Sequence, residues 1–175
     1  MKRIVCLLLT ALLLTVTLSA AAGPESLIGT TFPDFTVTAY GGETFTLSEA
    51  LETHDLVVIN FWASWCGPCQ YEFPYMEAAY EQYADRVAVI ALSVEPGDTD
   101  KVFGEFVDYF HFKFHVGRDQ ENLFRLTQSQ GIPTTLIIGS GRTVLAADVG
   151  AKTSISAFTK WFDSFLPAAA GADAE

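Results

Sequence analysis

Two long apolar runs constrain the fold of this chain more than any other feature. They are Leu56–Trp62 and Val87–Val94, and both contain several β-branched residues. Such runs suit strands that are buried on both faces, as in parallel sheets. Between them, residues 67–83 carry apolar side chains at helical spacing. We therefore expect a strand–helix–strand unit, which is the repeating unit of α/β proteins.

The segments on either side extend this pattern to a mixed sheet. Short strands at 35–38 and 44–47 surround the Gly41-Gly42 turn and predict an N-terminal β-hairpin. A helix that begins after Asp98 or Thr99 is expected to bury Val102, Phe103, Phe106, Val107 and Phe110. The remaining expected elements are a short helix at 119–128, strands at 135–138 and 143–149, and a last helix at about 153–166 that buries Ile155, Phe158, Phe162 and Phe165. We predict one domain over residues 23–166, with a central mixed β-sheet flanked by helices.

Residues 1–22 have the layout of a secretory signal peptide. Lys2 and Arg3 precede an apolar stretch over Ile4–Leu18, and small residues follow it. The apolar stretch is short for a full membrane span, but a membrane tether through residues 4–18 stays open as the alternative. We therefore expect an extracytoplasmic protein, in the periplasm or at the outer face of the cytoplasmic membrane. The small and polar residues 167–175 predict a flexible tail.

The formal net charge of −11 restricts the partners of the protein. An acidic surface repels the phosphate backbone, so we expect no nucleic-acid partner. We interpret the acidic charge as a feature that keeps the protein soluble.

The cysteines indicate redox chemistry. Cys6 lies in the signal segment, which leaves only Cys66 and Cys69, separated by two residues. A structural disulfide stabilises a protein mainly by closing a long loop of the unfolded chain, and this pair closes almost none. In an exported protein, where disulfides persist, such an isolated pair indicates a redox-active disulfide.

The position of the pair assigns a role to each thiol. Cys66 falls where the first buried strand gives way to the helix, and free N–H groups at a helix start stabilise a thiolate. We therefore expect Cys66 to be the nucleophile and Cys69, one turn later and more buried, to be the resolving thiol. Gly67 and Pro68 set the geometry of the thiols, and proline is well tolerated at a helix start.

A metal site is the competing interpretation of the two cysteines. Structural zinc usually has four protein ligands, so the pair would need His111 and His115 as well. The alternating pattern around these histidines favours a strand or loop over a helix. We expect no metal and no cofactor.

The segment LVVINFWASWCGPC, from Leu56 to Cys69, resembles the active-site segment of thioredoxin-fold proteins. It is most similar to the exported TlpA/ResA-like branch of thiol–disulfide oxidoreductases. Residues 30–35 and the hairpin after them resemble the N-terminal extension of that branch. The stretch between Ser93 and Gly131 resembles its inserted helix, and Gly131–Thr135 resembles its cis-proline loop.

The resemblance implies further site residues. Pro133 is expected to be a cis-proline that faces the cysteines, and Ile132 is expected to pair with substrate through its backbone. Trp62 and Trp65 match aromatic residues that frame the site. Proposed substrate contacts are therefore Ile132, Pro133 and Trp65, with Gly67, Pro68, Asn60 and Trp62 in supporting positions.

Glu72 is the acidic residue that the family places close to the thiols. It lies three residues after Cys69 on the same helical face. If it is buried, its pKa should rise, and it can exchange protons with a thiol as a third catalytic residue. An exposed glutamate on the helix surface is the ordinary alternative. Asn60 stands where many thioredoxins have a buried aspartate, which shifts the proton-transfer role to Glu72.

The resemblance implies an enzyme that reduces disulfides in exported proteins, such as apocytochrome c, by dithiol–disulfide exchange. A membrane thiol–disulfide protein would return electrons to the pair, and we expect the protein to act as a monomer. Gly67-Pro68 is shared with strongly reducing thioredoxins, which favours the reducing direction. A disulfide oxidant or isomerase and a non-catalytic metal-delivery module remain alternatives. We do not expect a peroxidase, because the chain lacks the threonine-flanked cysteine of peroxiredoxins.

Overall fold

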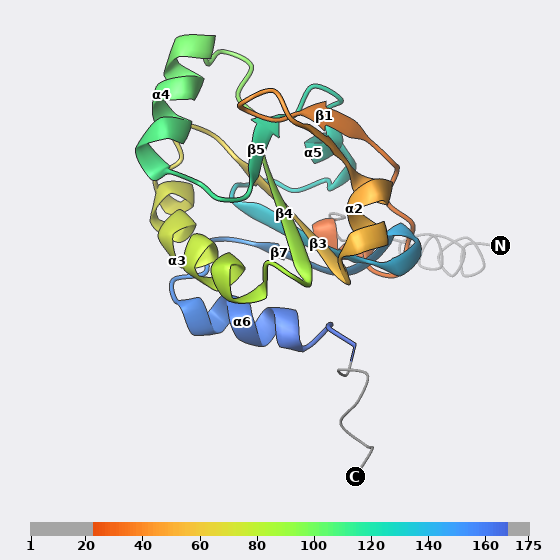
Figure 1. Cartoon of the computed structure of the whole chain (residues 1–175). Helices are drawn as coiled ribbons and strands as arrows, with labels where there is room; N and C mark the ends of the chain where they lie inside the picture. The colour runs from red at the N-terminus through yellow and green to blue at the C-terminus, as the bar shows by residue number, and fades with distance from the viewer. Residues whose placement is uncertain (1–22, 168–175) are drawn as a thin grey trace, which may run out of the picture.

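A five-stranded mixed sheet forms the centre of the protein (Figure 1). The computed structural model describes residues 23–167, so the predicted signal segment and almost all of the predicted tail lie outside the described residues. In spatial order the strands are β5 (His115–Arg118), β4 (Val87–Ser93), β3 (Leu56–Trp62), β6 (Thr134–Gly139) and β7 (Thr143–Val149). β5, β4 and β3 run parallel, and β6 and β7 run antiparallel to their neighbours. The predicted mixed sheet is confirmed.

The central pair of strands explains the apolar runs of the sequence. β3 and β4 pair in parallel from Leu56↔Val87 to Trp62↔Ser93, and every residue of both strands is buried. Successive side chains of a strand point to opposite faces of the sheet. Val58 and Trp62 therefore join the cluster on one face, and Val57, Ile59 and Phe61 join the cluster on the other.

Helices and a hairpin cover the two faces separately (Figure 1). One face is covered by α3 (Gly67–Tyr83), α4 (Asp100–Phe110) and α6 (Ile155–Asp163). The other is covered by α2 (Leu47–Thr53), α5 (Leu123–Leu126), the 3-10 turn η1 (Pro24–Leu27) and the predicted hairpin, whose strands are β1 (Thr36–Thr38) and β2 (Thr44–Thr46). A second 3-10 turn, η2 (Ser140–Arg142), joins β6 to β7. Within residues 23–167, none of the helices is both long enough and apolar enough to cross a bilayer.

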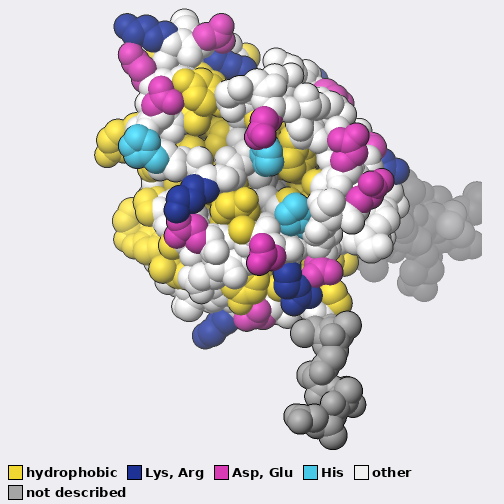
Figure 2. Space-filling model, in the orientation of Figure 1, with side chains coloured by type: hydrophobic (Ala, Val, Ile, Leu, Met, Phe, Trp, Pro, Cys, Tyr) yellow, Lys and Arg dark blue, Asp and Glu magenta, His cyan; other side chains and the backbone are white. Residues whose placement is uncertain are grey.

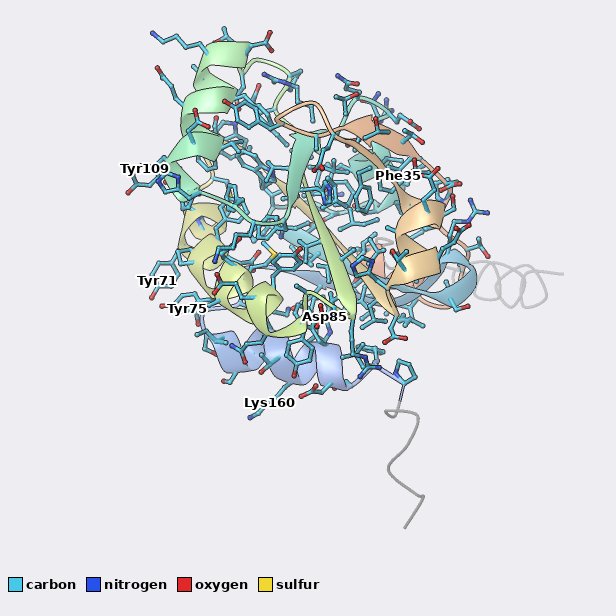
Figure 3. All side chains as sticks on the ribbon, viewed as in Figure 1. Phe35, Tyr71, Tyr75, Asp85, Tyr109 and Lys160 are labelled. Carbon is cyan, nitrogen blue, oxygen red and sulfur yellow. A yellow bond between two sulfur atoms is a disulfide. The ribbon has the colours of Figure 1, made fainter. Side chains whose placement is uncertain are left out.

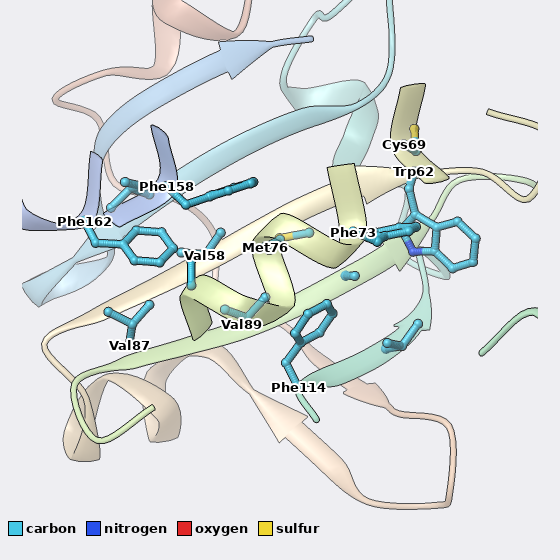
Figure 4. Packing of buried hydrophobic residues seen from close by; sticks show 14 of the residues in the cluster. Val58, Trp62, Cys69, Phe73, Met76, Val87, Val89, Phe114, Phe158 and Phe162 are labelled. Carbon is cyan, nitrogen blue, oxygen red and sulfur yellow. The ribbon is translucent and has the colours of Figure 1, made fainter. Parts of the chain in front are cut away.

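The face beneath α3 carries the larger aromatic core (Figure 4). Trp62 packs edge-on against Phe73 of α3, with ring centroids 5.4 Å apart, and stacks on Phe106 of α4 at 4.5 Å. Phe158 and Phe162 of α6 are fully buried further along the same face. These contacts fix α3 rigidly on the sheet, and the site described below lies at the start of that helix.

One predicted helix is much shorter than expected, and one segment for which the sequence allowed two structures is a strand. The helix expected at 119–128 is reduced to Leu123–Leu126, because Asn122 and Gln128 both have positive φ and interrupt the helix on either side. The carboxylate of Asp119 instead accepts the N–H groups of Leu123 and Phe124, at 2.7 and 2.9 Å. His115–Arg118, for which the pattern allowed a strand or a loop, forms edge strand β5.

Two residues predicted to be buried are exposed. Val102 is 45% exposed because Phe103 and Val107 form the stripe of α4 that faces the sheet, and Val102 lies one position to the side of it. Ile155 is 39% exposed because α6 begins at this residue, directly after its cap Ser154. Helix periodicity places both residues at the edge of an apolar face. How far the buried part of that face extends is determined only by the packing against the sheet.

The contrast within α6 is testable by mutation. Phe162→Ala should reduce the free energy of unfolding by about 3–5 kcal/mol, since it removes a fully buried ring. Ile155→Ala, on the same helix, should change it by less than about 0.5 kcal/mol. Urea unfolding followed by circular dichroism measures both. Equal losses for the two variants would contradict the observed packing of α6.

Candidate active site

Cys66 lies at the junction of β3 and α3. The sheet ends at Trp62, a short turn follows, and the N–H of Cys66 donates to the carbonyl of Ala63 at 3.0 Å. Cys66 is the N-cap residue of α3, and its carbonyl accepts the N–H of Gln70 at 3.1 Å. The residues after it suit a helix start, because Pro68 lacks the N–H that would have no partner there. The predicted helix start at the cysteine pair is confirmed.

Cys66 and Cys69 form a disulfide (Figure 3). Their Cα atoms are 5.3 Å apart, and the N–H of Cys69 donates to the sulfur of Cys66 at 3.2 Å. Cys69 is fully buried, whereas 3% of Cys66 is exposed. A backbone donor that reaches a sulfur at the positive end of a helix dipole is the arrangement that stabilises a thiolate once the disulfide is reduced.

The loop before β6 faces the same sulfur. The Ile132–Pro133 peptide bond is cis, and the carbonyl oxygen of Ile132 lies 3.7 Å from Cys66 Sγ. Among the described residues, neither the N–H nor the carbonyl of Ile132 makes a backbone hydrogen bond. The loop is held from both sides: the Thr134 hydroxyl donates to the Gly131 carbonyl at 2.6 Å, and the N–H of Gly150 donates to the Pro133 carbonyl at 2.8 Å. Ile132 thus offers backbone groups without a backbone partner next to the sulfur of Cys66.

Glu72 belongs to a buried polar cluster beneath the cysteines. It is 1% exposed, which excludes the alternative of a surface glutamate. Asn60 of β3 donates through Nδ2 to Glu72 Oε1 and to the hydroxyl of Thr135, both at 2.9 Å. The backbone N–H of Lys152 donates to Glu72 Oε2 at 2.7 Å. Asn60 is itself fully buried, and its Oδ1 has no partner in the part of the chain that the structure describes.

Burial raises the pKa of Glu72 to about 7, as the sequence predicts in direction. The hydrogen bonds from the Lys152 amide and from Asn60, together with the charge of Lys152, oppose this rise because they favour the carboxylate. The side chain of Lys152 is directed elsewhere: it pairs with Asp148 and lies 4.0 Å from the ring centre of Trp161. Glu72 therefore changes its protonation state near neutral pH, within one helical turn of Cys69.

The two tryptophans occupy different environments. Trp62 is fully buried in the core under the site, and its indole N–H has no partner among residues 23–167. Trp65 is 67% exposed next to Cys66, and its indole N–H donates to Glu95 Oε2 at 2.7 Å. This hydrogen bond and that from Gly97 lower the pKa of Glu95. Only Trp65 is placed to meet another molecule.

Sequence reasoning did not identify several partners of these residues. Thr135, which faces Asn60 across the β3–β6 pair, follows from strand register, and register is known only once the pairing is known. Lys152 contributes its main-chain N–H, for which side-chain identity gives no signal. Glu95 follows the end of β4, where polar residues of α/β proteins often meet ligands, and this signal was available in the sequence.

The predicted metal alternative is not supported by the placement of the histidines. His111 ends α4 in a left-handed conformation, whereas His115 lies in β5, where its Nε2 is 3.4 Å from Glu43. Within residues 23–167 there is no group of three or more histidine, cysteine or acidic side chains arranged to hold a metal.

Comparisons with known proteins agree with this geometry. The sequence model that describes the AhpC/TSA family matches residues 28–147 of this chain. The thiol–disulfide oxidoreductase ResA of Bacillus thuringiensis (strain Al Hakam) is 33% identical over 132 residues, which cover 72% of each chain. The thioredoxin-like protein YneN of Bacillus subtilis (strain 168) is 31% identical over 122 residues, which cover 69% of this chain and 71% of YneN.

Solved structures show the same fold. A protein of Chlorobium tepidum described as the thiol:disulfide interchange protein DsbE is 29% identical with a TM-score of 0.65, over 78% of this chain and 93% of its own. StoA of Bacillus subtilis has a TM-score of 0.65 at 18% identity, over 75% of this chain and 98% of StoA, which bears on the fold alone. The chain therefore belongs to the AhpC/TSA family, as a thioredoxin-fold thiol–disulfide oxidoreductase similar to ResA.

Proposed function

We propose that the protein reduces disulfides of exported proteins outside the cytoplasm, with Cys66 as the nucleophile. One observation carries the proposal. Cys66 Sγ lies between a backbone N–H donor at the start of α3 and the unpaired backbone of Ile132. The first stabilises the attacking thiolate, and the second can hold an extended substrate against it.

The reaction follows from disulfide exchange. In the reduced enzyme, the Cys66 thiolate attacks one sulfur of a substrate disulfide, that bond breaks, and the departing substrate thiolate takes up a proton. A mixed disulfide joins Cys66 to the substrate. Cys69 then loses its proton and attacks Cys66 Sγ, which releases the second substrate thiol after protonation. Two electrons pass from the enzyme to the substrate, Cys69 gives up one proton and solvent supplies the second, and the Cys66–Cys69 disulfide of this structure is the product.

Glu72 is proposed as the group that accepts the proton of Cys69. Both residues are buried on the same helix, where bulk water is not available as a base. A base acts most effectively when its pKa is close to the working pH, and that of Glu72 is raised to about 7. Asn60 and the Lys152 amide hold the carboxylate in one position by hydrogen bonds to both of its oxygens.

The compartment and the partners rest on the sequence. The signal segment predicted in residues 1–22 supports export, or a tether through residues 4–18. Outside the cytoplasm, cysteines of newly exported proteins become oxidised and need a reductant. We propose such proteins as substrates, apocytochrome c among them, and a membrane thiol–disulfide protein as the electron donor.

Trapping tests the direction of attack. A Cys69→Ala variant cannot resolve the mixed disulfide, so it should accumulate covalent adducts through Cys66 in its home compartment, and mass spectrometry of these adducts identifies the substrates. Cys66→Ala is the matched control and should form none. Adducts that form equally through Cys69 in the control, or none with either variant, would contradict the proposed role of Cys66.

The role of Glu72 predicts a pH profile. The rate at which Cys69 resolves a mixed disulfide of Cys66 should rise with pH through about 7, because only the carboxylate form of Glu72 accepts a proton. Glu72→Gln should remove this inflection and slow the step at pH 8 by roughly a hundredfold. Stopped-flow release of thionitrobenzoate from Cys66 measures the rate.

Glu77→Gln provides the matched control. Glu77 lies on the same helix and also has a pKa raised by burial, but it accepts the N–H of Lys113 instead of facing Asn60. This variant should keep the inflection of the unmodified protein. If Glu72→Gln kept it as well, another group would be the proton acceptor.

A further inference from the structure

A groove lies along α4, beside residues that flank the cysteine pair in the sequence. It has a volume of about 480 Å³ and is here called the α4 groove. Its lining residues are Ser64, Trp65, Gln70, Val102, Glu105, Phe106, Tyr109 and Phe110. Ser64, Trp65 and Gln70 surround Cys66 in the sequence, so one end of the groove lies next to the nucleophile. The lining residues after them all belong to α4, the helix inserted between β4 and β5.

The walls of the α4 groove are apolar and exposed. Trp65, Val102 and Tyr109 are 67%, 45% and 78% exposed, although each is a large hydrophobic side chain. Figure 2 shows hydrophobic side chains along the edge of the molecule where α3 and α4 lie, and Tyr109 is directed away from the body in Figure 3. The floor is rigid, because Phe106 stacks on the buried Trp62. A preformed apolar groove with exposed aromatic walls suits the apolar side chains of another chain.

The rim of the groove is acidic. Glu105 lines the groove, and its side chain is 68% exposed. Glu95 holds the indole of Trp65, and the hydroxyl of Ser64 donates to Asp98 Oδ1 at 2.7 Å. Asp98 Oδ2 is buried and has no partner among the described residues.

The nearby cations leave much of this charge uncompensated. Arg118 is fixed by the carbonyl of Asp98 and by Asp100. Lys101 is 81% exposed and 3.8 Å from Glu105, so this pair is a weak surface contact. An occupant that brings its own positive charge is therefore favoured over a neutral or acidic one.

We propose that the α4 groove binds an extended segment of the substrate protein that has an apolar or aromatic residue beside its cysteine and a lysine or arginine shortly after it. The inference rests on the proposed function and adds a substrate class to it. The segment pairs with the backbone of Ile132, its apolar side chain enters the groove, and its cation reaches Glu105. Cys66 is only 3% exposed, and contacts with Ile132 and with the groove would together hold a protein disulfide against its sulfur.

Peptide disulfides test the charge preference. Three short peptides carry one cysteine linked to thionitrobenzoate, followed by phenylalanine and lysine, by phenylalanine and glutamate, or by two serines. The lysine peptide should have a kcat/KM roughly five- to tenfold higher than the glutamate peptide, and added salt should reduce the difference. Glu105→Gln should lower the ratio of kcat/KM between the lysine and glutamate peptides, because it removes one negative charge from the rim. Equal rates for the lysine and glutamate peptides would overturn the inference.

Matched variants test the groove itself. Val102→Asn should lower the ratio of kcat/KM for the lysine peptide to that for hydroxyethyl disulfide by about fivefold, because it places an uncharged polar side chain in the apolar wall. Leu126→Asn is the control: Leu126 is 44% exposed, close to the 45% of Val102, but lies on α5 at the other face of the sheet. Equal ratios for the two variants would contradict the groove.

The remaining outcomes separate the inference from the function it rests on. Reduction of hydroxyethyl disulfide without any preference among the peptides would reject the groove and leave the reductase intact. No reduction of either kind of disulfide would reject both. If Val102→Asn changed the oligomeric state in sedimentation and left the ratio unchanged, the groove would be a contact between two copies of this chain, and the substrate-binding inference would be wrong.

Discussion

The free N–H groups at the start of α3 are the interaction on which the chemistry of this protein depends. One of them, from Cys69, points at the sulfur of Cys66, and the helix dipole adds a positive potential at the same place. The position is fixed from behind, because β3 is buried on both faces and ends four residues before Cys66. An apolar strand at the centre of the sheet thus determines where a polar and reactive group emerges. Packing of Trp62 and Phe73 keeps helix and strand together at that point.

The cluster around Glu72 shows how burial produces a carboxyl group that titrates near neutral pH. A carboxylate in an apolar setting is costly unless it is hydrogen-bonded, and both oxygens of Glu72 are. Its donors are neutral, an amide side chain and a backbone N–H, so they only partly offset the loss of water. The resulting pKa near 7 keeps both protonation states accessible. The same donors tie β3 and the loop after β7 to α3, and the Gly150 amide ties that loop to Pro133.

Much of the fold and the cysteine site could be predicted from the sequence, for identifiable reasons. The buried strands follow from runs such as Leu56–Trp62, and the redox pair follows from its spacing and its place before a helix. The cis-proline and the position of Glu72 close to the thiols came from family resemblance, whereas the burial of Glu72, on which the rise of its pKa depends, was open until the packing was known. The exposure of Val102 could not be predicted, because helix periodicity does not say where the covered face ends. The hydrogen bond from the Lys152 amide to Glu72 could not be predicted either, since it comes from the backbone and not from a side chain. The acidic α4 groove could not be predicted because it depends on how α4 lies beside α3.

The most direct test of this account is the titration of Cys66 in the reduced protein. Site-specific alkylation by iodoacetamide, quantified by mass spectrometry across a pH series, reports the fraction of Cys66 present as thiolate, and the same protein unfolded in denaturant provides the reference. If the start of α3 stabilises the thiolate, the pKa of Cys66 in the folded protein lies well below that in the unfolded chain. A folded-state value equal to or above the unfolded one would contradict the account.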